Sequence, residues 1–350
     1  MTLKTETYLL NINKNSLIKY YNFLDNSFKK TADKNSVITK YLNLGIKTIR
    51  LQIAFADFLP QLEKYFSCSL KDTANNYDAT IYIWKDTVYS YISEQYNKSK
   101  WITISHEKKE FMQIDLENNI INAENKEEEK YYFIAENYSY DILSKQGHLF
   151  VKSISKIIRT EYSALVHSAA VGINNKGILI SAKGGSGKST LSVSCLTNGF
   201  QYVSDDYLIL KKSNNKLYAS PIYSIITLSP QIYKQMTNLK SEFMCNNYNN
   251  TKYILNISSY DINIINNLEI KAVVFPKISN IAEPTIEKTN KNTAVTQLVY
   301  STATQMNNNK DTEYIKLLIS FIKDLDFYQI NLSQNLDKNV TILKQFIKEL

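Results

Sequence analysis

Short apolar runs alternate with polar stretches along most of the chain, and their spacing predicts a mixture of strands and helices. In the first 150 residues, segments rich in β-branched and aromatic residues predict strands at 79–84, 101–104, 111–115 and 130–134. The charged stretch 124–130 predicts a solvated hairpin loop, and segments 36–42 and 55–66 predict short helices. The first part of the chain is therefore expected to form an α/β unit of its own.

The remainder of the chain shows the same mixture with longer helical segments. Apolar residues at helical spacing predict a helix over about 140–161 that joins the two halves. Strands are predicted at 176–181, 208–212, 217–219, 222–228, 270–275 (ending at Pro276) and 327–332, and helices at 190–199, 293–301, 314–325 and 338–350. The asparagine-rich stretch 246–250 predicts a mobile loop. We therefore expect an N-terminal α/β accessory domain over 1–139, a linking helix over 140–162 and a second α/β domain over 163–350.

Composition narrows the class of protein. A chain of 350 residues with 44% hydrophobic content fits two globular domains. It has no apolar run of about 18 residues, so no transmembrane helix is expected. Residues 1–7 lack the apolar core of a signal peptide, and Cys68, Cys195 and Cys245 lack metal-ligand spacing. These features favour a cytoplasmic protein with no membrane partner.

The net charge of +8 does not by itself indicate a nucleic-acid partner. The 41 basic residues are dispersed along the chain, and only Arg50 and Arg159 are arginines. Because arginine usually supplies the bidentate contacts to phosphates and bases, we expect no binding to nucleic acid. A mild positive field is compatible with ATP or with an acidic peptide.

Segment 182–190 reads AKGGSGKST and has the residue types of a phosphate-binding P-loop. Glycines let backbone N–H groups approach a phosphate, Lys188 can reach its oxygens, and the Ser189 hydroxyl can bind Mg²⁺. A predicted strand precedes the loop and a predicted helix follows it, an arrangement that favours a bound anion. The residues expected to bind the nucleotide are Gly184, Gly185, Ser186, Gly187, Lys188, Ser189 and Thr190. The sequence therefore predicts a nucleoside triphosphate as ligand, with ATP and Mg²⁺ as the expected pair.

Three further residues flank the P-loop. His167 precedes Lys188 by 21 positions, and Asp205 follows it by 17, with Asp206 directly after. Neighbouring side chains on extended backbone point in opposite directions, so one aspartate can bind Mg²⁺ while the other accepts a proton. Taken singly, an aspartate pair is also typical of a turn, and a histidine in an apolar strand is often buried for packing.

Together, His167, the P-loop and Ser204-Asp205-Asp206 resemble the HPr kinase/phosphorylase family over about residues 165–210. The resemblance includes relatives that phosphorylate serines of ribosomally made peptides, and phosphoenolpyruvate carboxykinase more distantly. It implies an HPr-kinase-like P-loop domain behind an α/β accessory domain. It also implies phosphate contacts by Lys188, Mg²⁺ ligation by Ser189 with support from Asp205, a proton acceptor in Asp206, and His167 near the γ-phosphate. Segment 218–224 lacks the glutamate and arginines of the bifunctional enzymes, so the sequence leaves open whether phosphorolysis also occurs.

The combined features predict a Mg²⁺- and ATP-dependent kinase that phosphorylates a serine or threonine hydroxyl of a peptide or small protein. No four-residue apolar strand ending in Asp-Glu is present, which argues against an ATPase motor. Positive charge at the transferred phosphoryl group would come from Lys188 and Mg²⁺, with Lys211, Lys271 or Lys277 as candidate helpers. A small-molecule kinase and a non-catalytic nucleotide-binding switch are the alternatives.

The accessory domain carries no phosphate-binding loop and is rich in predicted strands and in tyrosine. We expect it to recognise the acceptor, since an exposed strand edge can add a peptide as a further strand. A purely structural cover for the kinase domain is the alternative. The sequence leaves assembly into a homo-oligomer open.

Overall fold

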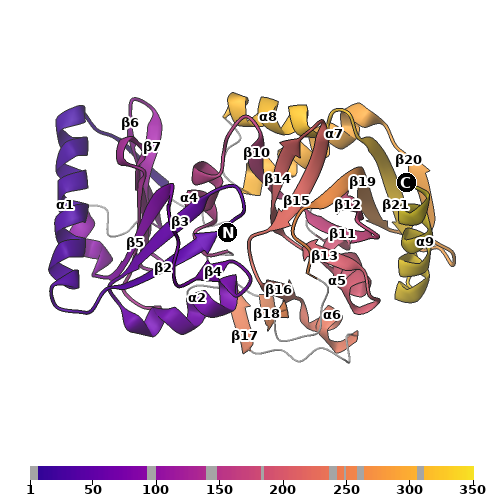
Figure 1. Cartoon of the computed structure of the whole chain (residues 1–350), viewed down its shortest axis with the longest axis horizontal. Helices are drawn as coiled ribbons and strands as arrows, with labels where there is room; N and C mark the ends of the chain where they lie inside the picture. Colours follow the sequence, from indigo (N-terminus) through magenta and orange to yellow (C-terminus); the bar gives the residue numbers. More distant parts are fainter. Residues whose placement is uncertain are drawn as a thin grey trace, which may run out of the picture. The chain divides into compact units, whose positions relative to one another are not determined.

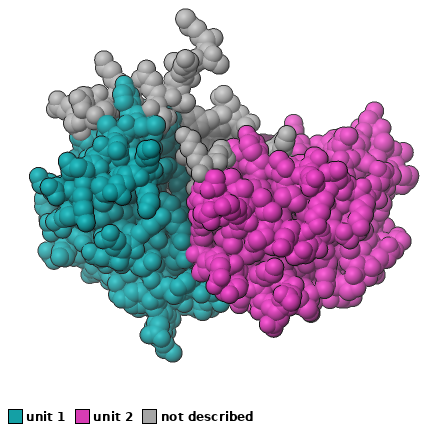
Figure 2. Space-filling view, turned by 90° about the horizontal axis from the view of Figure 1, so that it is seen from above, with its two compact units in different colours: residues 1–64, 69–157, 245–249 teal, residues 65–68, 158–244, 250–350 magenta. Residues whose placement is uncertain are grey.

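The computed structural model describes residues 7–92, 100–138, 148–182, 185–235, 243–247, 250–257, 264–305 and 311–350. The chain divides into two compact units, shown in separate colours in Figure 2. Unit 1 comprises residues 1–64, 69–157 and 245–249, and unit 2 comprises residues 65–68, 158–244 and 250–350. The main division, between residues 157 and 158, falls inside the segment predicted to link two domains.

Unit 1 is built on a mixed β-sheet (Figure 1), which in the described residues has nine strands in the order β1-β6-β7-β8-β9-β5-β3-β2-β4. Strand β5 runs parallel to both β9 and β3, β1 runs parallel to β6, and the other pairs are antiparallel. The strands are β1 (Thr7–Asn11), β2 (Ile38–Asn43), β3 (Thr48–Ile53), β4 (Leu70–Lys71), β5 (Ala79–Lys85), β6 (Trp101–His106), β7 (Lys109–Asp115), β8 (Ile120–Asn125) and β9 (Lys130–Ala135).

Helices cover both faces of the unit 1 sheet. Helix α1 (Lys14–Ala32) begins at Asn13, whose side chain accepts the Ser16 N–H at 2.9 Å, and it buries Leu24 and Phe28 in a core with β6 to β9. The opposite face is packed with aromatic rings, including Phe58 against Phe133. The remaining helices of this part are α2 (Leu59–Phe66), α4 (Val151–Ile157) and the 3₁₀ turns η1 (Ala56–Phe58), η2 (Val88–Tyr91) and η4 (Lys126–Glu128).

Unit 2 contains a second mixed sheet. Its described strands follow the order β10-β14-β15-β19-β12-β11-β13, and β21 pairs with the far part of β19 and with β20. These strands are β10 (Ser163–His167), β11 (Ala169–Ile173), β12 (Lys176–Ile180), β13 (Gln201–Ser204), β14 (Tyr207–Ser213), β15 (Lys216–Pro221), β19 (Leu268–Ile278), β20 (Thr285–Lys288) and β21 (Asp326–Leu332). A smaller sheet is formed by β16 (Ile225–Leu228), β17 (Phe243–Asn247) and β18 (Asn250–Asn256).

The large sheet of unit 2 lies between two layers of helices. Alternate residues of β12 enter opposite cores, since Ile178 and Ile180 pack with α5 (Lys188–Thr197) and α9 (Leu336–Glu349). Leu179 packs on the other face, in a core with α7 (Lys291–Gln305) and α8 (Thr312–Ile322). A short helix, α6 (Pro230–Gln235), follows β16. The architecture is mixed α/β, as predicted.

Most predicted elements are present with small shifts of their ends. The strands predicted at 79–84, 101–104, 111–115 and 130–134 are β5, β6, β7 and β9, and stretch 124–130 contains the turn between β8 and β9. The P-loop is preceded by β12 and followed by α5, and Gly199 after α5 has φ of +77°, as a terminating glycine requires. The helices predicted near the C-terminus are α7, α8 and α9, with β21 between the last two.

Two predictions about strands were wrong. Segment 36–42, predicted as a helix, forms most of β2, where the β-branched Ile38 and Thr39 fit a strand paired with β3. Strand β19 does not end at Pro276 but runs to Ile278 alongside β21. Its neighbour β12 ends opposite Val274, so the missing N–H of Pro276 removes no hydrogen bond from the sheet.

Two other predictions were only partly correct or cannot be followed. The linking helix predicted over 140–161 is represented by α4, which ends at Ile157, and residues 139–147 lie outside the described part. Within the stretch predicted as a mobile loop, residues 246–247 and 250 belong to β17 and β18, and residues 248–249 are outside the described part.

Candidate active site

The P-loop lies at the carboxyl ends of parallel strands in unit 2. Strand β12 runs parallel to β19, and β19 runs parallel to β21, so their carboxyl ends face the same edge of the sheet. The chain leaves β12 at Ile180 and enters α5 at Lys188. Of the expected phosphate-binding residues, Gly185 to Thr190 lie in the described part, and Gly184 lies outside it. An anion at this edge would meet the amino end of α5, where backbone N–H groups point outward.

Two glycines fix the shape of the loop. Gly185 has φ of +80° and Gly187, the residue before α5, has φ of +93°, both in the left-handed region that side chains disfavour. A Cβ on Gly187 would also lie 2.9 Å from Cδ1 of Leu332, at the end of β21. The loop therefore packs closely on the strand ends, and position 187 has no room for a side chain.

Lys188 is the first residue of α5, and its side chain points toward the turn after β13. Its Nζ donates to the backbone carbonyl of Asp205 and to Oδ1 of Asp206, the latter at 3.2 Å. The ammonium group thus links the P-loop to the aspartate pair. The predicted phosphate-binding lysine and the predicted acidic residues are brought together.

Asp205 and Asp206 form the turn between β13 and β14, and serines hold that turn. The Asp206 N–H donates to Oγ of Ser204 at 3.3 Å, and the same hydroxyl donates to the Tyr207 carbonyl at 2.8 Å. The Ser168 N–H donates to the Asp206 carbonyl at 2.8 Å. These bonds fix the backbone on both sides of Asp206, and its carboxylate is thereby aimed at Lys188.

His167 is the last residue of β10 and lies directly against Asp206. The distance from His167 Nε2 to Asp206 Oδ1 is 2.6 Å, and its ring centre is 5.4 Å from that of Tyr207. The His167 N–H donates to Oγ1 of Thr302 on α7 at 3.2 Å. His167 is buried, and its Nδ1 has no hydrogen-bond partner within the described residues. A single carboxylate oxygen is therefore shared between an imidazole and an ammonium group.

The two aspartates differ in how accessible they are. Asp205 is 2% exposed, whereas the side chain of Asp206 retains 26% of its accessible surface. Burial raises the pKa of the Tyr207 hydroxyl, and the Asp206 charge raises it further, so this neighbour stays a neutral phenol at physiological pH. Asp206 is the carboxylate of the pair that an incoming hydroxyl can more readily meet.

The donor atoms at this edge suit a hard divalent cation. The Ser189 hydroxyl and the two aspartate carboxylates are oxygen donors, the class that Mg²⁺ prefers, and nucleotide phosphates would complete the coordination shell. The described residues contain no group of three or more His, Cys, Asp or Glu side chains arranged to hold a metal alone. The residues therefore fit a metal that arrives with a nucleotide.

The three lysines considered as additional sources of positive charge lie at different places in unit 2. Lys271 lies in the middle of β19 and forms an ion pair with Glu269 at 2.6 Å, and Lys211 on β14 lies opposite Ser163, four residues from His167. Lys277 is exposed near the end of β19, and Cγ1 of its neighbour Ile278 would lie 3.6 Å from a Cβ built on Gly187. Lys277 is therefore the one of the three whose backbone lies at the carboxyl end of β19, and its side chain leaves the strand on the face opposite to that of Ile278.

The sequence analysis included Ser204 in the motif but did not identify how the site is held in place. The Ser204 hydroxyl beside a turn was an available signal, whereas Ser168 acts through its backbone N–H, which most residues could supply. Thr302 lies 135 residues beyond His167. No local pattern in the sequence connects these two positions.

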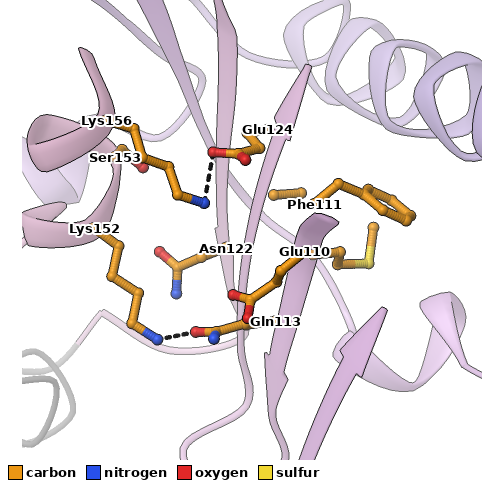
Figure 3. Close-up of a pocket in the computed structure, with 10 residues that line it drawn as sticks. Glu110, Phe111, Gln113, Asn122, Glu124, Lys152, Ser153 and Lys156 are labelled. Carbon is orange, nitrogen blue, oxygen red and sulfur yellow. Dashed lines mark hydrogen bonds and ion pairs between the residues drawn. The ribbon is translucent and has the colours of Figure 1, made fainter. Parts of the chain in front are cut away.

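A second polar cluster lies in unit 1, where α4 faces β7 and β8 (Figure 3). Nζ of Lys152 donates to Gln113, and Nζ of Lys156 lies 2.7 Å from a carboxylate oxygen of the buried Glu124. Burial raises the pKa of Glu110 and lowers that of Lys152, in each case against the attraction of the opposite charge. The enclosed space is about 20 Å³, room for about one water molecule, so the cluster holds α4 on the sheet rather than binding a substrate.

Comparison with known proteins gives no basis for assigning a family or a function. No family model matches the chain, and no curated protein matches it. Among solved structures, the chain is similar to the Hpr(Ser) kinase/phosphatase from Coxiella burnetii, with 16% identity and a TM-score of 0.30 over 53% of this chain and 88% of that one. A likeness this distant carries no argument about function, so the proposal below rests on the geometry of the site.

In the described part of the chain, no helix has both the length and the apolar character needed to cross a bilayer.

Proposed function

We propose that this protein is a Mg²⁺- and ATP-dependent kinase that transfers the γ-phosphoryl group to a serine or threonine hydroxyl of a peptide or small protein. One observation carries the proposal: Asp206 Oδ1 lies 3.2 Å from Nζ of the P-loop lysine and 2.6 Å from Nε2 of His167. A protein that only binds nucleotide has no need of an accessible carboxylate held beside its phosphate-binding lysine.

The hydrogen bonds of Lys188 indicate separate roles for Lys188 and Asp206 in the proposed reaction. Without nucleotide, Lys188 donates to Asp205 and Asp206. Phosphate oxygens at the loop would compete for its ammonium group, and Asp206 Oδ1 would then be available to the acceptor hydroxyl. His167 keeps its place against the carboxylate throughout, because the Thr302 hydroxyl and β10 hold its backbone.

In the proposed reaction, the acceptor oxygen attacks the γ-phosphorus, and its proton passes to Asp206. The new bond joins that oxygen to phosphorus, while the bond between phosphorus and the β–γ bridging oxygen breaks and ADP leaves with the electron pair. Lys188 stabilises the charge on the phosphate oxygens, and a Mg²⁺ ion, which Ser189 and Asp205 would hold, would supply further neutralisation. Lys277, at the carboxyl end of β19, is the candidate that would add further positive charge.

The first test is the Lys188→Ala variant, compared with the wild-type protein for Mg·ATP affinity and for phosphoryl transfer. We expect weakened ATP binding and loss of turnover with an unchanged fold, because the only side-chain cation directly after the loop is removed. Calorimetry measures the affinity, and radiolabelled ATP with serine-containing peptides measures the transfer.

The outcomes separate the alternatives. Unchanged Mg·ATP affinity in Lys188→Ala would show that the P-loop is not the nucleotide site. Wild-type ATP binding without transfer to any peptide, protein or small hydroxyl compound would favour a nucleotide-binding switch. Transfer to small hydroxyl compounds alone would favour a small-molecule kinase.

A further inference from the structure

A groove runs along one face of α1 in unit 1, far along the chain from the P-loop. Two adjoining cavities of about 520 and 560 Å³ form it, and they share Phe23 and Ser90 in their linings. The α1 residues that line it recur every three or four positions, so they form one continuous strip that Lys34 extends just past the end of the helix: Ser16, Lys19, Tyr20, Phe23, Asn26, Ser27, Lys30 and Thr31. The other wall is the end of β5 and the η2 turn, from Lys85 to Ile92.

The charge of this α1 groove is strongly one-sided. Among the described residues that line it, four are lysines and one is acidic: Lys19, Lys30, Lys34, Lys85 and Asp86. Lys19, Lys30 and Lys34 form no ion pair with any described residue of the chain. The groove therefore presents ammonium groups whose counter-charge must come from solvent or from a ligand.

The single carboxylate offsets only one of the four lysine charges, and hydrogen bonds from neutral groups hold it in place. Asp86 Oδ2 accepts the Ser27 hydroxyl at 2.8 Å and the Tyr91 hydroxyl at 2.7 Å, and its Oδ1 accepts the Thr87 N–H at 2.8 Å. Ser27 also accepts the indole N–H of Trp84 at 3.1 Å. This network ties α1 to the opposite wall, so the groove floor is formed before any ligand arrives.

The groove also offers apolar surface. Phe23 is 44% exposed and contacts the buried Tyr91 edge-on, with ring centres 5.1 Å apart. From Ser16 to Ala32, where α1 ends, the helix advances about 24 Å, at about 1.5 Å per residue. An extended peptide of about seven residues spans that distance. Length, charge and an exposed ring together suit a short acidic segment that carries large apolar side chains.

A peptide fits these features better than a nucleic acid does. No arginine lines the described groove, and arginine is the usual bidentate partner of phosphates and bases. Tyr91 is buried, and Tyr20 packs against Phe111, so neither ring offers the open face on which bases stack.

We propose that the α1 groove is a docking site for an extended acidic peptide segment with large apolar side chains. Lys19, Lys30 and Lys34 would pair with its carboxylates, and Phe23 would contact its apolar side chains. That this peptide belongs to the phosphoryl acceptor rests on the proposed function; the binding itself does not.

The test is binding of a fluorescein-labelled peptide to the full-length protein without nucleotide, followed by fluorescence anisotropy. The probe is a peptide of about ten residues in which glutamate alternates with leucine and phenylalanine. The variant Lys30→Glu/Lys34→Glu reverses two charges in the groove. Its matched control, Lys14→Glu/Lys29→Glu, reverses two exposed lysines of the same helix that do not line the groove. Phe23→Ala tests the apolar contact, and thermal melts check that each variant is folded.

We expect the groove variant to weaken peptide binding by about tenfold or more and the control variant to change it by less than about twofold. Phe23→Ala should weaken binding at any salt concentration, whereas the charge effect should shrink as salt is added. Absence of binding to the wild-type protein, or equal losses in the two double variants, would overturn the proposal. Tighter binding of a charge-matched single-stranded oligonucleotide would show that the groove binds a nucleic acid rather than a peptide. Because no ATP is present, these outcomes are independent of the Lys188→Ala result.

Discussion

Asp206 is the residue at which the polar contacts of the site converge. One of its carboxylate oxygens faces both Lys188 and His167, and its backbone is held by Ser204 and Ser168. Asp205, its neighbour in the chain, is almost fully buried, although its carbonyl also accepts from Lys188. Adjacent residues of the same type therefore occupy different environments, and we expect them to have different effects on the reaction.

Replacing Asp206 by asparagine should lower phosphoryl transfer by about 10²-fold or more and leave ATP affinity largely intact. Asparagine keeps the shape of the side chain but cannot accept the hydroxyl proton. Single-turnover transfer measured over a range of ATP concentrations checks both parts. Asp205→Asn is the matched comparison and should mainly raise the Mg²⁺ concentration needed for activity. Normal turnover in Asp206→Asn would contradict the assignment of the base.

His167→Ala should reduce the rate of transfer less than Asp206→Asn does. His167 contacts the carboxylate from the side of β10 and is not expected to transfer an obligatory proton. The expected effect is a smaller kcat with a changed pH profile, measured under the same assay. A loss as large as that of Asp206→Asn would show that the histidine itself takes part in proton transfer.

At the scale of elements, the site is assembled where the strand ends of unit 2 meet the amino end of α5. Strands β10, β12, β13, β19 and β21 each bring a residue or a turn to this edge. The loop between β12 and α5 fits against β21 because Gly187 has no side chain. Loop shape and strand packing therefore depend on each other.

Gly187→Ala should disturb nucleotide binding as well as stability. The added Cβ meets Leu332 at 2.9 Å, and φ of +93° is unfavourable for alanine by about 1–2 kcal/mol. We expect ATP affinity to fall by about tenfold or more, as measured by calorimetry. Gly199→Ala is the control, since Gly199 also has positive φ but open space around it. It should lower the melting temperature with ATP affinity unchanged, and equal affinity losses in both variants would argue against a specific role for Gly187.

Lys277 and Lys271 on β19 give a matched pair for the charge at the phosphates. Lys277→Ala should lower kcat by about three- to tenfold, because Lys277 lies at the carboxyl end of β19 and its long, exposed side chain can extend toward the phosphates. Lys271→Ala should have little effect on turnover, since Lys271 pairs with Glu269 away from that end. Steady-state kinetics of the two variants test this prediction. A larger loss of kcat in Lys271→Ala than in Lys277→Ala would show that Lys277 does not contribute charge at the phosphates.

At the scale of the whole molecule, the chain forms two units with separate hydrophobic cores, each built on its own mixed sheet. The candidate active site lies in unit 2, and the α1 groove and the charged cluster beside α4 lie in unit 1. The proposed phosphoryl transfer is thus assigned to unit 2, and the proposed peptide docking is assigned to unit 1.

The charged cluster of unit 1 predicts a pH-dependent contribution to stability. Burial lowers the pKa of Lys152 in the folded state below its unfolded value. Below the folded pKa the ammonium group is charged in both states and destabilises the fold, and this penalty disappears as pH rises toward the unfolded pKa. Lys152→Met should therefore gain most stability relative to wild type near neutral pH, and the gain should diminish as pH rises toward about 10.

Urea unfolding of unit 1 followed at several pH values tests this prediction. Lys109→Met, a change of an exposed lysine on β7, is the control and should show little dependence on pH. A stability difference for Lys152→Met that stays constant or grows with rising pH would contradict the prediction.

The sequence by itself determined the local features whose physical causes are local. The glycines of the P-loop and the short apolar runs of β12 and β19 were sufficient to predict those elements, and α8 and α9 were predicted in the right order along the chain. It also indicated His167, Lys188 and the aspartate pair as candidates. The sequence did not distinguish a strand from a helix at 36–42. This segment becomes a strand because it pairs with β3 and β4, which are other segments of the chain.

Only the tertiary structure decided which polar groups meet. The contact of His167 with Asp206 depends on the pairing of β10 with β14, and the support of His167 by Thr302 joins positions 135 residues apart. The choice of Lys277 over Lys271 follows from where β12 ends beside β19. The α1 groove likewise required the fold, because its two walls come from a helix and a distant strand end. Contacts between residues far apart in the chain depend on how the sheets assemble, and local sequence patterns do not contain that information.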